Sequence, residues 1–140
     1  MTATDTDEAK EELGVWRFEG GKIYQYVKSG ALIPAGESVV VDTSVTTAAL
    51  IGRQVVTVQS ATGLIRGIAE VTLPNLGFGW VTKYGPATAR VVTNANPGVA
   101  LTSSSTTGVL SVWGVSNLDV AAIALQTGLS AGSAVFVQAL

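Results

Sequence analysis

The sequence contains no cysteine and no histidine in its 140 residues. Without cysteine the chain has no disulfide and no thiol nucleophile, and without both residue types it lacks the commonest ligands of zinc, copper and iron. The missing histidine also removes the side chain that most often transfers protons at neutral pH. We therefore expect a protein that is not an enzyme and that needs neither a cofactor nor a metal.

Charged residues are also scarce. They make up 13% of the chain, whereas apolar residues make up 47%; a soluble domain usually has about 25% charged residues. A surface so poor in charge predicts that part of it is covered, either by further copies of the chain or by a partner. The net charge is −2, but residues 14–140 contain five acids and seven bases. Their net charge of +2 is too weak and too dispersed to indicate a nucleic-acid partner.

Long hydrophobic runs are missing as well. No stretch approaches the roughly 18 consecutive apolar residues of a membrane span, so we expect no membrane partner. The first residues, "MTATDTDEAKEEL", are acidic and lack the apolar run of a signal peptide. We expect the protein to stay in the cytoplasm in which it is made, or to leave it when the cell lyses.

The side chains that are present do not form a recognisable catalytic motif. Serine and threonine are frequent, but no histidine is available as their base. The five acids beyond the N-terminal region are dispersed at strand ends and turns, where solvated turn residues are favoured over a glycosidase pair. The aromatic residues would allow a stacking platform for sugars or bases, but core and interface positions explain them more simply.

The acids are concentrated at the N-terminus. Residues 1–13 contain one base, Lys10, and five acids: Asp5, Asp7, Glu8, Glu11 and Glu12. We predict an acidic arm over 1–13 that is either a flexible tail, a short helix capped by Thr6, or a segment that orders on a partner. Because the arm has few apolar residues, we expect the domain over 14–140 to fold without it.

The rest of the chain has the pattern of β-strands. "VWRFE" (15–19) and "KIYQYVK" (22–28) flank Gly20-Gly21, a two-residue hairpin signal. Similar stretches follow, among them "GFGWVTKYG" (77–85) and "TARVVT" (88–93), with turns such as "PAG" and "LPNLG" between them. The stretch 118–129 would also allow a helix, but its β-branched residues favour a strand. We predict a single all-β domain, a barrel or sandwich of roughly nine to eleven short strands.

Three segments together resemble the head decoration, or cement, proteins of tailed bacteriophages: "GGKIYQYVKSGALIPAGESVVV", "GIAEVTLPNLGFGWVTKYGPATARVV" and "IALQTGLSAGSAVFVQAL". The resemblance covers roughly residues 14 to 140 and leaves out the acidic arm. The matching positions are Tyr24, Tyr26, Val27, Ala35, Gly36, Gly67, Ile68, Ala69, Gly79, Trp80, Val81, Ala131, Gly132 and Val137.

This resemblance implies a β-barrel or β-tulip that binds the outer surface of a capsid, commonly as a homotrimer. Such a protein cements neighbouring major capsid protein subunits against the pressure of the packaged DNA. The acidic arm is then a candidate capsid contact, and the candidate structural or interface residues are Trp16, Tyr24, Tyr26, Trp80 and Trp113. The alternatives are a head-fibre or spike base, another virion structural protein, or a carbohydrate-binding module with exposed tryptophans.

Overall fold

The structure is a computed structural model that describes residues 4–5, 8–57, 65–104, 107–114, 120–128 and 132–139. These residues form eleven strands and no helix, which confirms the predicted all-β fold. No helix long and apolar enough to cross a membrane occurs among them. The strands are β1 (Thr4–Asp5), β2 (Trp16–Glu19), β3 (Lys22–Ser29), β4 (Ser38–Val41), β5 (Gln54–Thr57), β6 (Ile65–Ile68), β7 (Phe78–Ala89), β8 (Ala100–Thr102), β9 (Ser111–Val112), β10 (Ala122–Ala124) and β11 (Ser133–Gln138).

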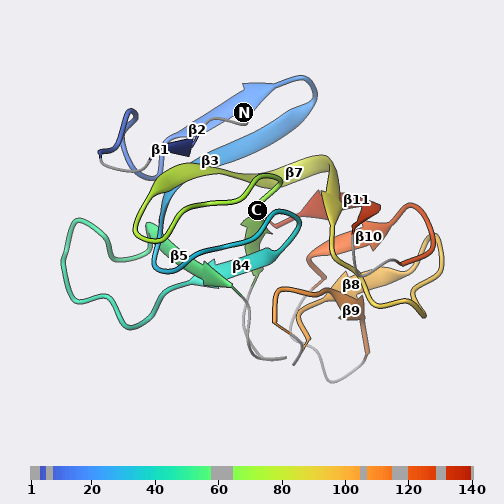
Figure 1. The fold of residues 1–140 in the computed structure, drawn as a ribbon. Helices are drawn as coiled ribbons and strands as arrows, with labels where there is room; N and C mark the ends of the chain where they lie inside the picture. Colours follow the sequence, from blue (N-terminus) through green and yellow to red (C-terminus); the bar gives the residue numbers. More distant parts are fainter. Residues whose placement is uncertain are drawn as a thin grey trace.

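Five of the strands close into a small barrel. β3 pairs with β5 in parallel, β5 with β4, β4 with β6, and β6 with β7, all antiparallel after the first pair. β7 then pairs with β3 and closes the ring, as Figure 1 shows on the side of the molecule that carries the β4–β5 loop. The barrel is filled by a cluster of buried apolar side chains, namely Val27, Ile33, Val39, Val55, Ala69, Leu73 and Val81.

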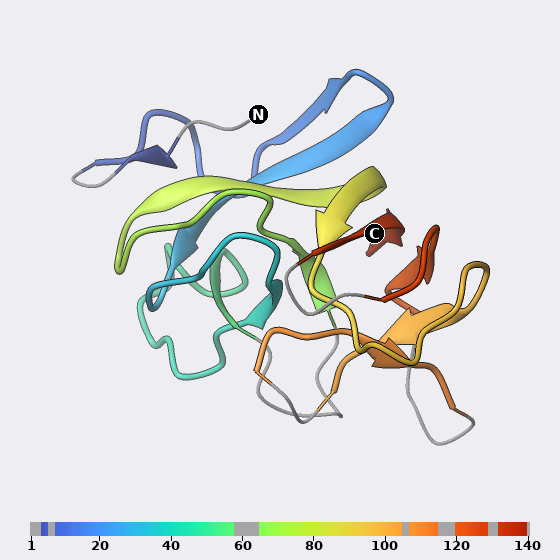
Figure 2. The same cartoon turned by 45° about the vertical axis from the view of Figure 1, so that its right-hand side comes forward.

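A second sheet continues from the barrel. β7 is twelve residues long, and its C-terminal half pairs with β11, followed in order by β10, β8 and β9. These strands lie together on one side of the barrel (Figures 1 and 2). Along the second half of β7, Gly85, Ala87 and Ala89 are buried while the residues between them are exposed. This alternation places the small residues of β7 against the buried core of the second sheet.

The long strand β7 corrects the sequence-based expectation of two separate strands at 77–85 and 88–93. Pro86 lies inside this continuous strand, although proline cannot donate a ladder hydrogen bond. In the structure β3 has its last pairing with β7 at Tyr84, and Pro86 lies beyond that point, opposite Phe136 of β11. Proline is therefore placed where β7 has a neighbouring strand on one side only.

The other strand predictions have mixed outcomes. The hairpin over Gly20-Gly21 is confirmed, with Glu19 opposite Lys22 and both glycines at positive φ, 59° and 76°. The stretch near 118–129 contains strand β10 and no helix within its described part, 120–128. The short-helix alternative for the arm is wrong where the arm is described, since residues 8–13 form bends and turns.

The arm also lies closer to the domain than its composition suggested. β1 pairs with the start of β7, and the Lys10 backbone N–H donates to the Tyr26 hydroxyl at 3.1 Å. Leu13 packs, partly buried, against a cluster of aromatic side chains. The arm therefore covers part of the barrel, which differs from the expectation of a segment that contributes little to packing.

Candidate binding surface

The face of the barrel beneath the arm carries an aromatic cluster, which consists of Tyr24, Tyr26 and Trp80. The rings of Tyr26 and Trp80 have centroids 5.0 Å apart and are tilted by 56°. The Arg17 guanidinium lies 5.4 Å from the centre of the Trp80 ring. All three aromatic residues are buried, so they support the surface from below and are not available to a partner.

Trp16 and Trp113 are exposed, by contrast, at 42% and 39%. Trp16 belongs to β2, together with Phe18, which is 74% exposed; Trp113 follows β9. β2 and β9 are the two ends of the strand order, and they lie on opposite sides of the molecule in Figures 1 and 2. The exposed tryptophans therefore do not form a common platform on which a sugar chain could stack.

The acids of the arm are partly neutralised within the chain. Glu8 binds Lys10 with an Oε1–Nζ distance of 2.9 Å, and Glu11 binds Arg17 of β2. Among the described residues Glu12 has no ion-pair partner, and Asp7 lies outside the described residues. Asp5 belongs to β1, where its backbone faces Phe78. The arm is thus held to β7 by its backbone and to β2 by an exposed ion pair.

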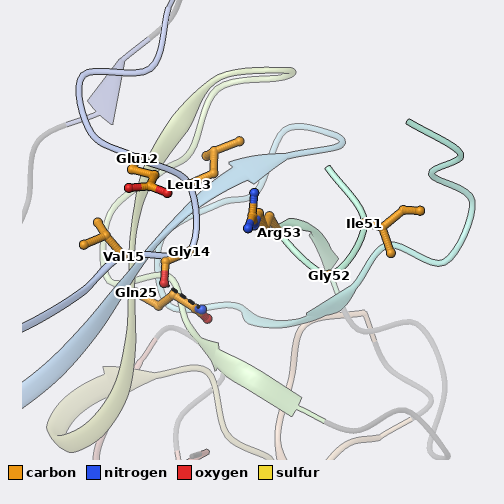
Figure 3. A pocket seen from close by; sticks show the side chains of 8 residues that line it. All are labelled: Glu12, Leu13, Gly14, Val15, Gln25, Ile51, Gly52 and Arg53. Carbon is orange, nitrogen blue, oxygen red and sulfur yellow. Dashed lines mark hydrogen bonds between the residues drawn. The ribbon is translucent and has the colours of Figure 1, made fainter. Parts of the chain in front are cut away.

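A hollow opens between the arm and the beginning of β5 (Figure 3). It is lined by Glu12, Leu13, Gly14, Val15, Gln25, Ile51, Gly52 and Arg53. The buried Gln25 lies at its base and donates from Nε2 to the Gly14 carbonyl oxygen at 3.3 Å. At its rim Ile51 is 59% exposed. The hollow therefore combines polar and apolar walls.

The hollow exists because two segments form backbone hydrogen bonds with the same edge of β3 and then diverge. At one point the Gly14 N–H donates to the Tyr26 carbonyl, 2.8 Å away, and the chain continues into β2. Two residues further along β3, the Lys28 N–H donates to the Arg53 carbonyl, 3.0 Å away, and that chain continues into β5. The two segments diverge between these points, and the space between them is the hollow.

Arg53 and Ile51 were missed by the sequence analysis. The only signal for Arg53 is that it is the first charged residue after the uncharged stretch 43–52. Nothing in the sequence indicates that this residue lies beside Gly14, because that contact depends on the parallel pairing of β3 with β5. Within the described ranges no group of three or more potential metal ligands comes together.

Lys83 is another residue that the sequence analysis did not single out. It is 1% exposed, and its Nζ lies 6.0 Å from the centre of the Trp16 ring. Burial, together with the positive charge of Arg66, lowers the pKa of Lys83 from 10.5 to about 8. At neutral pH the protein therefore keeps a charged ammonium group in a site that disfavours it.

We predict that Lys83→Met stabilises the protein at pH 7 by about 2 kcal/mol, because it removes this cost of burying the charge. The cost is present in full below pH 8, where both the folded and the unfolded chain are protonated. It disappears as the pH rises from about 8 towards 10.5, since there the folded chain loses its proton before the unfolded chain does.

Chemical unfolding of both proteins between pH 7 and pH 10.5 measures this difference. Lys28→Met, which changes a half-buried lysine of the neighbouring strand β3, is the matched control. A gain in stability that stayed constant across the pH range would contradict the assignment of the effect to the Lys83 charge.

Comparison with known proteins gives one informative result. No protein-family model matches the chain, and no curated protein matches its sequence. Among solved structures, the chain is similar to the base of a head fibre, described as "The crystal structure of head fiber gp8.5 N base in bacteriophage phi29". The TM-score is 0.58 at 12% sequence identity, and the match covers 81% of this chain and 92% of that chain. At this identity the likeness shows a shared fold.

Proposed function

We propose that this protein is a structural component of a bacteriophage particle. The observation that carries the proposal is the fold shared with a head-fibre base over 81% of the chain. The sequence resemblance to head decoration proteins points to the same class of protein independently. In this role the protein acts by adhesion, without catalysis and without a cofactor, and has neither a nucleic-acid nor a membrane partner.

Within this class we propose that the protein binds the outer surface of the capsid and cements neighbouring subunits of the major capsid protein. The barrel and the second sheet share the continuous strand β7, so contacts made by each of them would link two capsid subunits through one backbone. The exposed apolar side chains, such as Phe18 at 74% and Trp16 at 42%, provide area to bury in such a contact.

The fold likeness also favours a second candidate, the base of a head fibre. A fibre base attaches a projecting structure to the head and does not need to link capsid subunits. The two candidates therefore share the location on the head and differ in whether the head becomes mechanically stronger.

Heads assembled without this protein should release their DNA at a lower temperature than heads that carry it, because the bridging contacts between subunits are missing. Release is followed by the fluorescence of a DNA-binding dye during heating, and addition of the purified protein to the deficient heads should restore the original temperature. Equal release temperatures, with loss of a visible projection in electron micrographs, would favour the fibre base instead. Absence of the protein from purified particles would contradict both candidates.

We also propose that the protein associates with itself as a homotrimer, since only 13% of its residues are charged while large apolar side chains remain exposed. Light scattering of the purified protein should give three times the chain mass of 14.3 kDa. A stable monomer at micromolar concentration in the absence of capsids would contradict this proposal.

The acidic arm remains a proposed capsid contact. Its exposed ion pairs are individually worth less than about 1 kcal/mol, so a basic capsid surface could displace Lys10 from Glu8 at little cost. In a trimer the same weak contact occurs three times and adds through avidity.

The triple variant Asp5→Asn, Asp7→Asn and Glu8→Gln should bind heads more weakly than the wild type at low salt, and its binding should depend less on salt. It keeps the backbone pairing of β1 with β7, so its unfolding free energy should stay within about 0.5 kcal/mol of the wild type. Glu11 remains unchanged because it forms an ion pair with Arg17. Glu12 remains unchanged because it lines the hollow. Identical binding curves across a salt series would show that the arm is not an anchor.

A further inference from the structure

We propose that the hollow between the arm and β5 binds an acidic side chain of the major capsid protein, with Arg53 as its partner and an adjacent apolar side chain packed on Ile51. This inference rests on the proposed function, because it names the part of the protein that recognises the capsid. It requires an acidic group on the capsid subunit opposite the hollow, in addition to the basic patch proposed opposite the arm.

The first argument is the electrostatic state of Arg53. The chain has eight lysine and arginine residues, and four of them form ion pairs with acids of the chain. Arg53 has no ion-pair partner among the described residues. Asp42, whose carboxylate lies on the adjacent β4–β5 loop, instead accepts hydrogen bonds from Ser44 and from the Gln54 side chain.

These hydrogen bonds keep Asp42 charged, and they lower the pKa of its carboxyl group below the ordinary value. The carboxylate is thus satisfied without Arg53. The Arg53 guanidinium remains available for two parallel hydrogen bonds to an external carboxylate, the geometry for which arginine is well suited.

The second argument is that the walls of the hollow are fixed before a partner arrives. Gly14 and Arg53 are each attached to β3 by a backbone hydrogen bond, 2.8 Å to Tyr26 and 3.0 Å to Lys28. Arg53 is held from the other side as well, since its N–H donates to the Leu50 carbonyl at 2.9 Å. A partner therefore does not have to order the backbone on either side of the hollow, which lowers the entropic cost of binding.

The third argument is the shape and chemistry of the walls. Gly14 has φ of +86°, and a Cβ atom at this position would lie 3.5 Å from Arg53 Nε, so the missing side chain leaves the guanidinium uncovered. Ile51 provides an apolar rim on the loop beside it (Figure 3). A segment that places a carboxylate next to an aliphatic side chain satisfies both parts of the hollow.

Glu12 on the arm side limits which segments fit. Its negative charge disfavours a second acid next to the one bound by Arg53. The hollow should therefore prefer an isolated acidic side chain to a run of acids. Removal of the Glu12 charge should therefore strengthen binding. If Glu12 instead contacted a basic patch of the capsid directly, the same change would weaken binding.

The test uses fluorescently labelled full-length protein and purified heads that lack it. Arg53 is exposed in the free protein, and Arg53→Gln should weaken binding by up to about tenfold, because it removes a charge-assisted hydrogen bond to the bound carboxylate. Arg53→Lys, which keeps the charge but not the forked geometry, should restore part of the affinity. Glu12→Gln should bind about twofold to threefold more tightly than the wild type. Arg66→Gln, with the same change of charge on β6 outside the hollow, should bind as the wild type does.

The outcomes separate this inference from the proposed function. If the wild type binds heads and Arg53→Gln binds equally well with an unchanged melting temperature, the hollow is not the site while the proposed function stands. If Glu12→Gln weakens binding, the capsid group at the hollow is basic and the inference is wrong. If the wild type does not bind the heads at all, both the inference and the proposed function are overturned.

Discussion

The architecture depends on one strand that belongs to two sheets. β7 closes the barrel by pairing with β3 and then pairs with β11, which carries the remaining strands of the second sheet. The change of partner occurs at Gly85, where φ is +108° and a Cβ atom would lie 3.0 Å from the Gly21 carbonyl oxygen. Glycine is needed at this bend, because any larger residue would meet both the strained conformation and the backbone of the β2–β3 turn. The cores of the barrel and of the second sheet are separate clusters of buried side chains. The continuous backbone of β7 therefore joins them.

A second shared edge, on β3, determines where the hollow lies. The edge of β3 opposite β7 pairs first with the segment before and within β2 and then with β5. The first partner is antiparallel and the second is parallel, so the two chains run away from each other and leave a hollow between them. The arm is fixed by the same arrangement, since Gly14 and Val15 exchange hydrogen bonds with Tyr26. Under the proposed function the arm and the hollow form one surface, whose position is set by β3.

The sequence predicted those features that depend on local chemistry. The strand class follows from β-branched residues and regular turns, and the hairpin follows from Gly20-Gly21, whose positive φ angles are those that glycine allows. The continuity of β7 through Pro86 was not predictable, because it depends on β3 ending its pairing at Tyr84. For the same reason the hollow was missed: Gly14 and Arg53 are neighbours only through two long-range pairings with β3. The burial of Lys83 beneath Trp16 also contradicts what its residue type suggests, since lysine is almost never fully buried.

The likeness to a head-fibre base at 12% identity fits this division between local and long-range determinants. A barrel filled mainly by valine, alanine, leucine and isoleucine can exchange these residues for one another at small cost, provided that volume and alternation are kept. Such a fold keeps its shape while most of the sequence changes. Under the proposed function, the barrel core then carries little information about the capsid partner, and specificity depends on exposed residues at positions fixed by the backbone. In this chain Arg53 and Ile51 meet that description, because the shared edge of β3 fixes the backbone of Arg53 while Ile51 remains 59% exposed beside it.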